Sequence, residues 1–367
     1  MQRLHDLFNV QQLETIKDAP LFMGTRHPTW FPLYYEQPRP IDYLVHGAVR
    51  NIYLQSDGSR WLQDLTSRLL DVEDINNASS SLAEIRAYGG LLEAGFSVAA
   101  IPRHDESTPD FCIDAGDGPI TVEVFAKHQD KEQDNLLQDN LLNAVHSENA
   151  LLTNGIERTS QVAGNFSIQT TVVELTPAGR PNPAKLNDSV QANMISRVCA
   201  IKQNENQIPE DRPALLVMDF AHFGGPVGAE FLQSGQAAPI ESGHHGITCG
   251  SIWYAMYGWK NAPVFEEGSH KLVRMGHDGR FRLTGKNRSK LSAILVVLAN
   301  SAMLLENPWA THRLPDRARL SLCRFPWFDL PRSIADWHIG DADQQIAIHR
   351  RMIETMDQNY SGFWSQW

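Results

Sequence analysis

Residues 79–103, SSSLAEIRAYGGLLEAGFSVAAIPR, decide the fold of this chain. Apolar residues recur in the first part at helical spacing, which predicts a helix with one buried face: Leu82, Ile85, Tyr88, Leu91 and Leu92. The three serines before Leu82 can cap such a helix, and Gly95 is typical of the residue that ends one. Residues 96–103 then predict a short strand.

A hairpin is predicted directly after this strand. DFCID (110–114) and ITVEVFA (120–126) read as strands, and AGDG (115–118) between them reads as a turn. Further on, PALLVMDF (213–220) and LSAILVVLA (291–299) are apolar runs typical of strands that are buried on both faces. This order predicts an α/β fold with a mixed central sheet flanked by helices.

The flanking residues predict three parts. Residues 1–78 are an N-terminal arm, rich in proline and aromatic residues, with a helix at 59–71; an independent small domain is the alternative for 1–60. Residues 79–315 form the core, and residues 316–367 form a C-terminal helical extension with a packing or dimer helix at 341–357. The remaining patterns predict helices at 128–149 and 189–207, a strand at 165–177, a strand followed by a helix over Leu291–Leu305, and either a helix or a strand at 251–259.

Composition excludes several classes of protein. Of the 367 residues, 42% are hydrophobic and 20% are charged, which excludes wholesale disorder. Lys and Arg number 32 against 43 Asp and Glu, and the formal charge of -11 disfavours a protein that holds nucleic acid through its overall charge. An apolar run of about 18 residues, a secretion signal and closely spaced cysteines are all missing, so we expect a cytoplasmic protein with no membrane partner.

Three acidic residues form the candidate catalytic constellation. Hydrolysis of a phosphodiester with Mg²⁺ uses two or three carboxylates that converge on the cation. Asp110 stands at the start of one predicted hairpin strand, Glu123 lies in its partner, and Glu84 is on the preceding helix. A basic group beside the second carboxylate would orient water or stabilise charge in the transition state.

Pro109-Asp110 followed by Glu123-Val124-Phe125-Ala126-Lys127 resembles the PD-(D/E)XK nuclease superfamily, over about residues 79–220 and extending toward 315. The resemblance implies a restriction-endonuclease-like fold and a Mg²⁺- or Mn²⁺-dependent endonuclease, with DNA favoured over RNA and a role in bacterial defence. It implies that Asp110 and Glu123 hold the metal, that Glu84 is an outer ligand, and that Lys127, or else Lys202, orients the attacking water.

One position departs from the family pattern. Phe125 stands where the family lysine belongs, and Lys127 follows two residues later on the same strand face, with α-carbons about 13 Å apart from Glu123 to Lys127. The alternative function is therefore a nuclease-fold module that has lost catalysis and binds nucleic acid or protein. Simpler roles also remain open: Glu84 completes an S-x-x-E capping box with Ser81, Asp110 is a turn residue, and Lys127 is a solvated strand end.

Residues 271–290, KLVRMGHDGRFRLTGKNRSK, hold seven basic residues against Asp278, in contrast with the acidic chain around them. They are candidates for contact with phosphate, or a solvated hairpin on which Arg280 and Arg282 share a strand face. The nucleic-acid contacts expected are Arg274, Arg280, Arg282, Lys286 and Arg288, together with Lys202. His222, His244 and His245 lie in glycine-rich loops; a metal-dependent hydrolase of a non-nucleic substrate is the third possibility, although loop histidines without a role are simpler.

Overall fold

A six-stranded mixed sheet forms the centre of the protein in a computed structural model. The structure describes residues 3–20, 26–36, 40–101, 108–126, 156–163, 166–173, 208–221, 249–264, 273–274, 278–283, 289–298, 301–336 and 339–360. In sheet order, the strands are β1 (Ser97–Ala100), β2 (Phe111–Asp114), β3 (Pro119–Ala126), β6 (Ala214–Asp219), β9 (Ala293–Val297) and β10 (Ala302–Glu306). The expected α/β class with a mixed sheet flanked by helices is confirmed.

The pairing of the strands follows their composition. β1, β2 and β3 form an antiparallel meander, β3 and β6 are parallel, β6 and β9 are parallel, and β9 and β10 are antiparallel. Every residue of β6 and β9 is buried, as expected for apolar strands in the middle of a sheet that is covered on both faces. Positive φ angles at Gly116 (97°) and Gly118 (110°) allow the tight β2–β3 turn.

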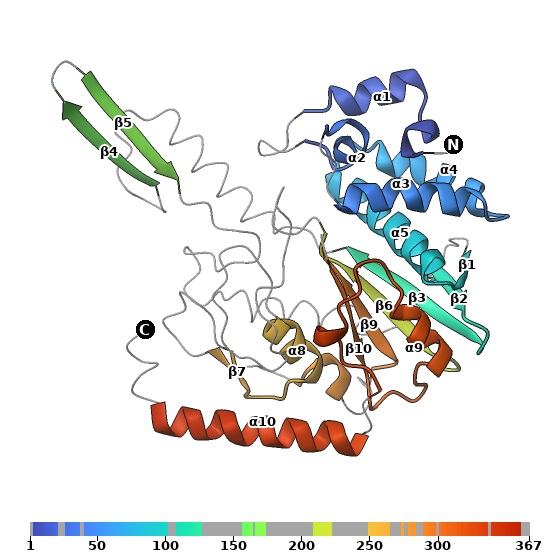
Figure 1. The fold of residues 1–367 in the computed structure, drawn as a ribbon, viewed down its shortest axis with the longest axis vertical. Coiled ribbons are helices and arrows are strands. Elements are labelled where there is room, and N and C mark those ends of the chain that lie inside the picture. The colour runs from blue at the N-terminus through green and yellow to red at the C-terminus, as the bar shows by residue number, and fades with distance from the viewer. Residues whose placement is uncertain are drawn as a thin grey trace.

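Helices from the N-terminal part cover one face of the sheet (Figure 1). They are η1 (Leu4–Leu7), α1 (Val10–Lys17), α2 (Trp30–Tyr34), α3 (Pro40–Tyr53), α4 (Gly58–Leu69) and α5 (Ile75–Glu93). Side chains of these helices, such as Leu62 and Tyr88, share one hydrophobic core with Val122 of β3 and Val217 of β6. We call it the helix-side core; α9 (Asp316–Leu322) contributes Leu322 to it.

A second hydrophobic core lies on the other face of the sheet. Leu216 of β6 and Val296 of β9 meet Met256 and Tyr257 of α8 (Cys249–Tyr257), and Ile346 of α10 (Ile339–Tyr360) joins them. We call it the α8-side core. Successive residues of a strand point to opposite faces, which is why β6 contributes Leu215 and Val217 to one core and Leu216 and Met218 to the other.

Several elements differ from the sequence-based expectation. The helix expected from residue 79 begins at Ile75, and its cap is Asp74, whose side chain accepts a hydrogen bond from the Asn76 N–H. Ser81 is therefore inside the helix, where its hydroxyl donates to the Asn77 carbonyl, and the capping role for Glu84 is wrong. Likewise, the helix expected after β9 is the strand β10.

The ambiguous and peripheral segments complete the fold. Residues 251–259, left open between helix and strand, lie mostly in α8, and Arg280 and Arg282 belong to the 3-10 helix η3 (Arg280–Arg282) instead of a strand. Further elements are the strands β4 (Ile156–Ala163), β5 (Phe166–Val173), β7 (Pro263–Val264) and β8 (Val273–Arg274) and the 3-10 helix η5 (Leu330–Arg332). The helices expected at 128–149 and 189–207 lie outside the described residues. Among the helices described, none combines the length and apolar character that crossing a membrane requires.

Candidate functional site

Glu84 is bound by an arginine from the neighbouring helix. Arg68 Nη1 lies 2.7 Å from Glu84 Oε1 and Arg68 Nη2 lies 2.9 Å from Glu84 Oε2, the parallel geometry of a bidentate pair. The Arg68 side chain is 24% exposed and that of Glu84 is 7% exposed, so the guanidinium stands between the carboxylate and solvent. Glu84, predicted as an outer metal ligand, has both of its oxygens engaged by Arg68.

Asp110 lies where the pairing of β2 with β3 ends. Its N–H donates to the Val122 carbonyl (3.1 Å), and its Oδ2 accepts a hydrogen bond from the Val124 N–H (2.8 Å). These partners are the two chain neighbours of Glu123, so Asp110 lies directly across from Glu123 at the open end of the hairpin. The structure therefore brings Asp110 and Glu123 together, as the sequence predicted.

Glu123 is a buried carboxylate in an otherwise mainly apolar strand, with 5% of its surface exposed. Val122 and Val124 on either side pack against the helix-side core, and Phe125 packs against the α8-side core. Alternation along β3 thus directs Glu123 toward the face opposite the one that α5 covers. Glu84 and Glu123 consequently belong to different sides of the sheet, and Asp110 lies between them at its end.

The charge of Asp110 links it to Arg68. Partial burial opposes the charge on Arg68, but the hydrogen-bonded Glu84 carboxylate and the nearby charge of Asp110 outweigh it and raise the pKa of Arg68 above its ordinary value. One arginine therefore serves two of the three predicted acids. Lys127 and Lys202, the predicted catalytic lysines, lie outside the described residues, as do His222, His244 and His245.

The donor set fits a smaller metal site than the sequence suggested. Within the described ranges, no three His, Cys, Asp or Glu side chains lie close enough to hold one ion together. Glu84 does not fit as a ligand, because both oxygens bind Arg68. Asp110 and Glu123 fit, since Mg²⁺ commonly takes one or two carboxylates and completes its shell with water and phosphate oxygens.

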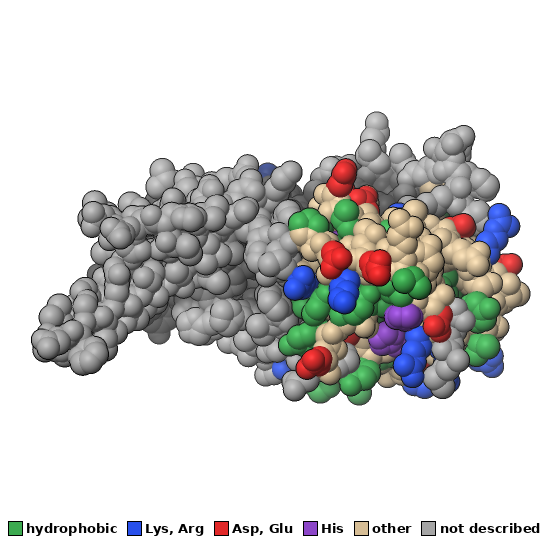
Figure 2. All heavy atoms as spheres, turned by 90° about the horizontal axis from the view of Figure 1, so that it is seen from above, with side chains coloured by type: hydrophobic (Ala, Val, Ile, Leu, Met, Phe, Trp, Pro, Cys, Tyr) green, Lys and Arg blue, Asp and Glu red, His purple; other side chains and the backbone are tan. Residues whose placement is uncertain are grey.

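The predicted nucleic-acid contacts are only partly described. Arg280 is 1% exposed in η3, so its guanidinium does not face solvent as the sequence suggested. Arg282 is partly exposed and its guanidinium carbon lies 5.3 Å from the centre of the Trp309 ring. Arg274 is described only as backbone in β8, and Lys286 and Arg288 lie outside the described residues. Figure 2 shows one face of the described part, where acidic and basic side chains are interspersed.

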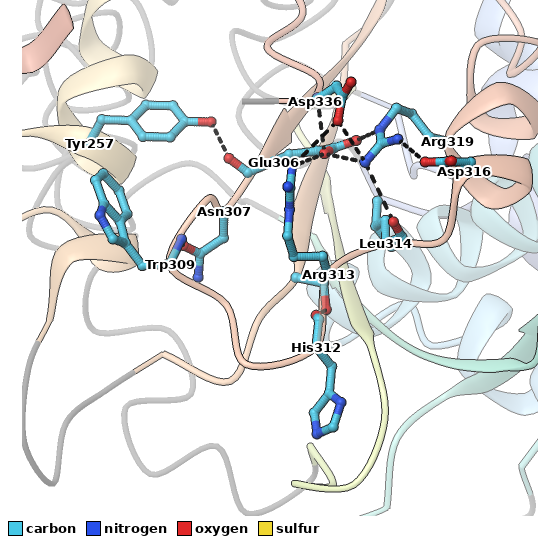
Figure 3. Close-up of polar contacts among 11 residues, drawn as sticks. Tyr257, Glu306, Asn307, Trp309, His312, Arg313, Leu314, Asp316, Arg319 and Asp336 are labelled. Atoms are coloured by element: carbon cyan, nitrogen blue, oxygen red, sulfur yellow. Dashed lines mark hydrogen bonds and ion pairs between the residues drawn. The ribbon is translucent and has the colours of Figure 1, made fainter. Parts of the chain in front are cut away.

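A second polar cluster surrounds Glu306 at the end of β10 (Figure 3). Its carboxylate receives two hydrogen bonds from Arg319 and one from the Asp336 N–H, and its carbonyl accepts a hydrogen bond from the Tyr257 hydroxyl at 2.7 Å. Burial, first, and the charge of Glu306 raise the pKa of Tyr257 well above its ordinary value. The cluster connects α8, α9 and the segment before α10, which is a structural role.

Sequence reasoning missed two arginines that matter here. Arg68 lies in the helix predicted over 59–71, but nothing in the sequence pairs it with an acid 16 residues later. Arg86 stands beside the apolar stripe of α5 and forms a buried ion pair with Asp219 at the end of β6. A basic residue on a helix that is otherwise apolar is the one signal that pointed to Arg86.

The chain matches no model of a protein family, no curated protein and no solved structure.

Proposed function

We propose that the chain is a divalent-metal-dependent nuclease that acts on DNA in preference to RNA, with Asp110 and Glu123 as the metal ligands. The observation that carries the proposal is the placement of Asp110 across from Glu123, with hydrogen bonds to both neighbours of that residue. Charged side chains are rarely retained in buried strand positions unless they have a specific task. We place the protein in the cytoplasm.

The order of elements supports the proposal independently of the acids. A helix (α5) is followed by a three-stranded antiparallel meander (β1–β3) and then by a strand parallel to the last of these (β6). This is the arrangement that the resemblance to PD-(D/E)XK nucleases implies, with the two acids at the end of the meander. A divalent ion bound there supplies a water of lowered pKa and offsets the charge of the phosphate.

The chemistry assigned to the chain is hydrolysis. The oxygen of water forms a bond to phosphorus, the bond from phosphorus to one bridging oxygen breaks, and a proton passes to that leaving oxygen. The contribution of the carboxylates is position and charge, because they gather at the end of one hairpin the negative groups that a hard cation requires. Asp110 is held by its bond to Val124, which keeps its carboxylate from rotating freely.

Two conservative variants test the assignment. Asp110→Asn retains an oxygen that can accept the Val124 N–H, and Glu123→Gln retains the shape of the side chain, so both should fold. Asp114→Asn is the matched control: its carboxylate accepts the Gly116 N–H (2.6 Å) at the other end of the same hairpin. With plasmid, single-stranded DNA and RNA in Mg²⁺ or Mn²⁺, we expect cleavage by wild type and by Asp114→Asn, and none by the two site variants.

The alternative is a nuclease-fold module without catalysis that binds nucleic acid or protein. Phe125 in the place of the family lysine favours it, as does the engagement of Glu84 by Arg68. Calorimetric titration with Mn²⁺ separates the two functions. Binding that disappears in Glu123→Gln supports the enzyme, whereas a folded wild-type chain that binds no Mn²⁺ and cuts no substrate supports the module.

A further inference from the structure

The proposed site needs a cation that its motif does not supply. Phe125 occupies the strand position two residues after Glu123, and it packs against the α8-side core. A phosphate that gains negative charge during cleavage is stabilised by a nearby fixed positive group, which is commonly worth a factor of about 100 to 1,000 in rate. The group must therefore come from another element of the fold.

Arg68 is placed to be that group. It reaches the end of the β2–β3 hairpin from α4, and the carboxylate of Glu84 holds it there with two hydrogen bonds of 2.7 and 2.9 Å. A guanidinium has five N–H donors, and the pair with Glu84 uses two of them, so the others can reach a phosphate oxygen. Because the Arg68 side chain is 24% exposed, a substrate at the surface can contact it.

Exposure separates the roles of the two partners. Glu84 is 7% exposed and lies behind the guanidinium, so a substrate or a hydrated metal ion would meet Arg68 before it met Glu84. Asp110, the acid nearest the end of the sheet, is close enough for its charge to act on Arg68. Guanidinium binds phosphate in a planar, bidentate manner, which suits a group that must recognise and stabilise the same ligand.

We propose that Arg68 is the catalytic cation of the Asp110–Glu123 site, in place of the missing motif lysine, and that Glu84 is its positioning residue and not a metal ligand. This inference rests on the proposed nuclease function. It assigns the transition-state contact to a residue of α4, which precedes the whole motif in the chain. It also explains why the acid on α5 is kept although its oxygens face an arginine.

The test removes the cation without leaving a buried charge. Arg68→Met alone would leave Glu84 buried without its partner, which is strongly destabilising. The double variant Arg68→Met with Glu84→Gln replaces the pair by neutral groups of similar size and should fold. We expect it to bind Mn²⁺ at least as tightly as wild type by calorimetry, while kcat on plasmid falls by about 100-fold or more. Added methylguanidinium should restore part of the missing kcat.

The single variant Glu84→Gln tests the positioning role. It keeps Arg68 but weakens its anchor, so we expect unchanged affinity for Mn²⁺ together with a smaller loss of kcat than in the double variant. Weaker Mn²⁺ binding in Glu84→Gln would make Glu84 a ligand and overturn the inference, as would full activity of the folded double variant. A wild-type chain that neither binds Mn²⁺ nor cleaves DNA would instead refute the proposed function, and this role with it.

Discussion

Arg86 and Asp219 form a buried ion pair that fastens α5 to the end of β6. Arg86 Nε lies 2.9 Å from Asp219 Oδ2, Arg86 Nη2 lies 3.0 Å from Asp219 Oδ1, and both side chains are 2% exposed. Asp219 Oδ1 also accepts the Ala221 N–H at 2.9 Å. Two residues 133 positions apart thus set the helix that carries Glu84 against the strand that pairs with the Glu123 strand.

Replacing one member of this pair should destabilise the protein severely. Arg86→Met leaves the Asp219 carboxylate buried without its counter-charge, which typically lowers the free energy of unfolding by about 3–5 kcal/mol. Urea unfolding followed by circular dichroism measures the change. The control is Arg350→Ala, which removes an exposed pair with Glu354 on α10 and should change the free energy of unfolding by about 0.5 kcal/mol or less. Equal effects of the two variants would contradict the structural role.

The close approach of α3 and α5 gives a second prediction. A β-carbon added at Gly89 would lie 2.1 Å from the Ala48 Cβ, so Gly89→Ala forces the helices apart. We expect a loss of about 1–3 kcal/mol of unfolding free energy. Gly47→Ala, on the facing helix, is the matched control. Its nearest new contact is the flexible end of Glu93 at 3.6 Å, so the gain in helix propensity, up to about 1 kcal/mol, should prevail.

Much of the sheet could be predicted because its strands carry local signals. Pro213 and the apolar run after it indicate β6, and the Gly/Asp turn at 115–118 indicates the hairpin of β2 and β3. β10 was mistaken for a helix, because Ala302, Met303, Leu304 and Leu305 favour helices as isolated residues. Pairing with β9 overrides that preference, and burial of all five β10 residues follows from the pairing.

The candidate site was predictable only where it is local. Asp110 and Glu123 belong to one hairpin, so the strand pairing that the sequence indicates already places them across from each other. The partners of Glu84 and Asp219 depend instead on how α4 and α5 pack, over separations of 16 and 133 residues. Arg68 and Arg86 therefore remained unrecognised, although each decides what an acidic residue can do.

The buried ring of His27 makes stability depend on pH. His27 is 2% exposed, its Nδ1 accepts the Thr29 N–H (3.3 Å), and its Nε2 lies 3.0 Å from the Asp71 carbonyl, an arrangement that suits the neutral ring. Burial lowers the pKa of His27 below its ordinary value of 6.5, only partly offset by the Asp71 carbonyl. The unfolded chain therefore binds the proton first, and stability falls as pH drops through about 6.5 toward the folded-state pKa.

His27→Gln should remove this contribution. We expect the variant to be less stable than wild type at pH 8 and the difference to shrink as the pH approaches 5, in urea unfolding measured across that range. His5→Gln, an exposed substitution in η1, should parallel wild type at every pH. A difference between His27→Gln and wild type that stays constant over the range would show that His27 does not couple folding to protonation.

The basic segment can be divided experimentally by the exposure of its arginines. Removing one basic side chain that binds phosphate should lower the slope of log affinity against log salt by about one. Arg282, partly exposed beside Trp309, can bind phosphate in this way, so Arg282→Ala should reduce the slope for a DNA duplex while the fold survives. Arg280 is 1% exposed, so Arg280→Met should lower the free energy of unfolding and leave the slope unchanged. Fluorescence anisotropy over a salt series, paired with urea unfolding of each variant, measures both quantities. A folded Arg280→Met chain with the same reduced slope as Arg282→Ala would mean that η3 turns Arg280 outward when DNA binds, and the assignment of the two arginines would then be wrong.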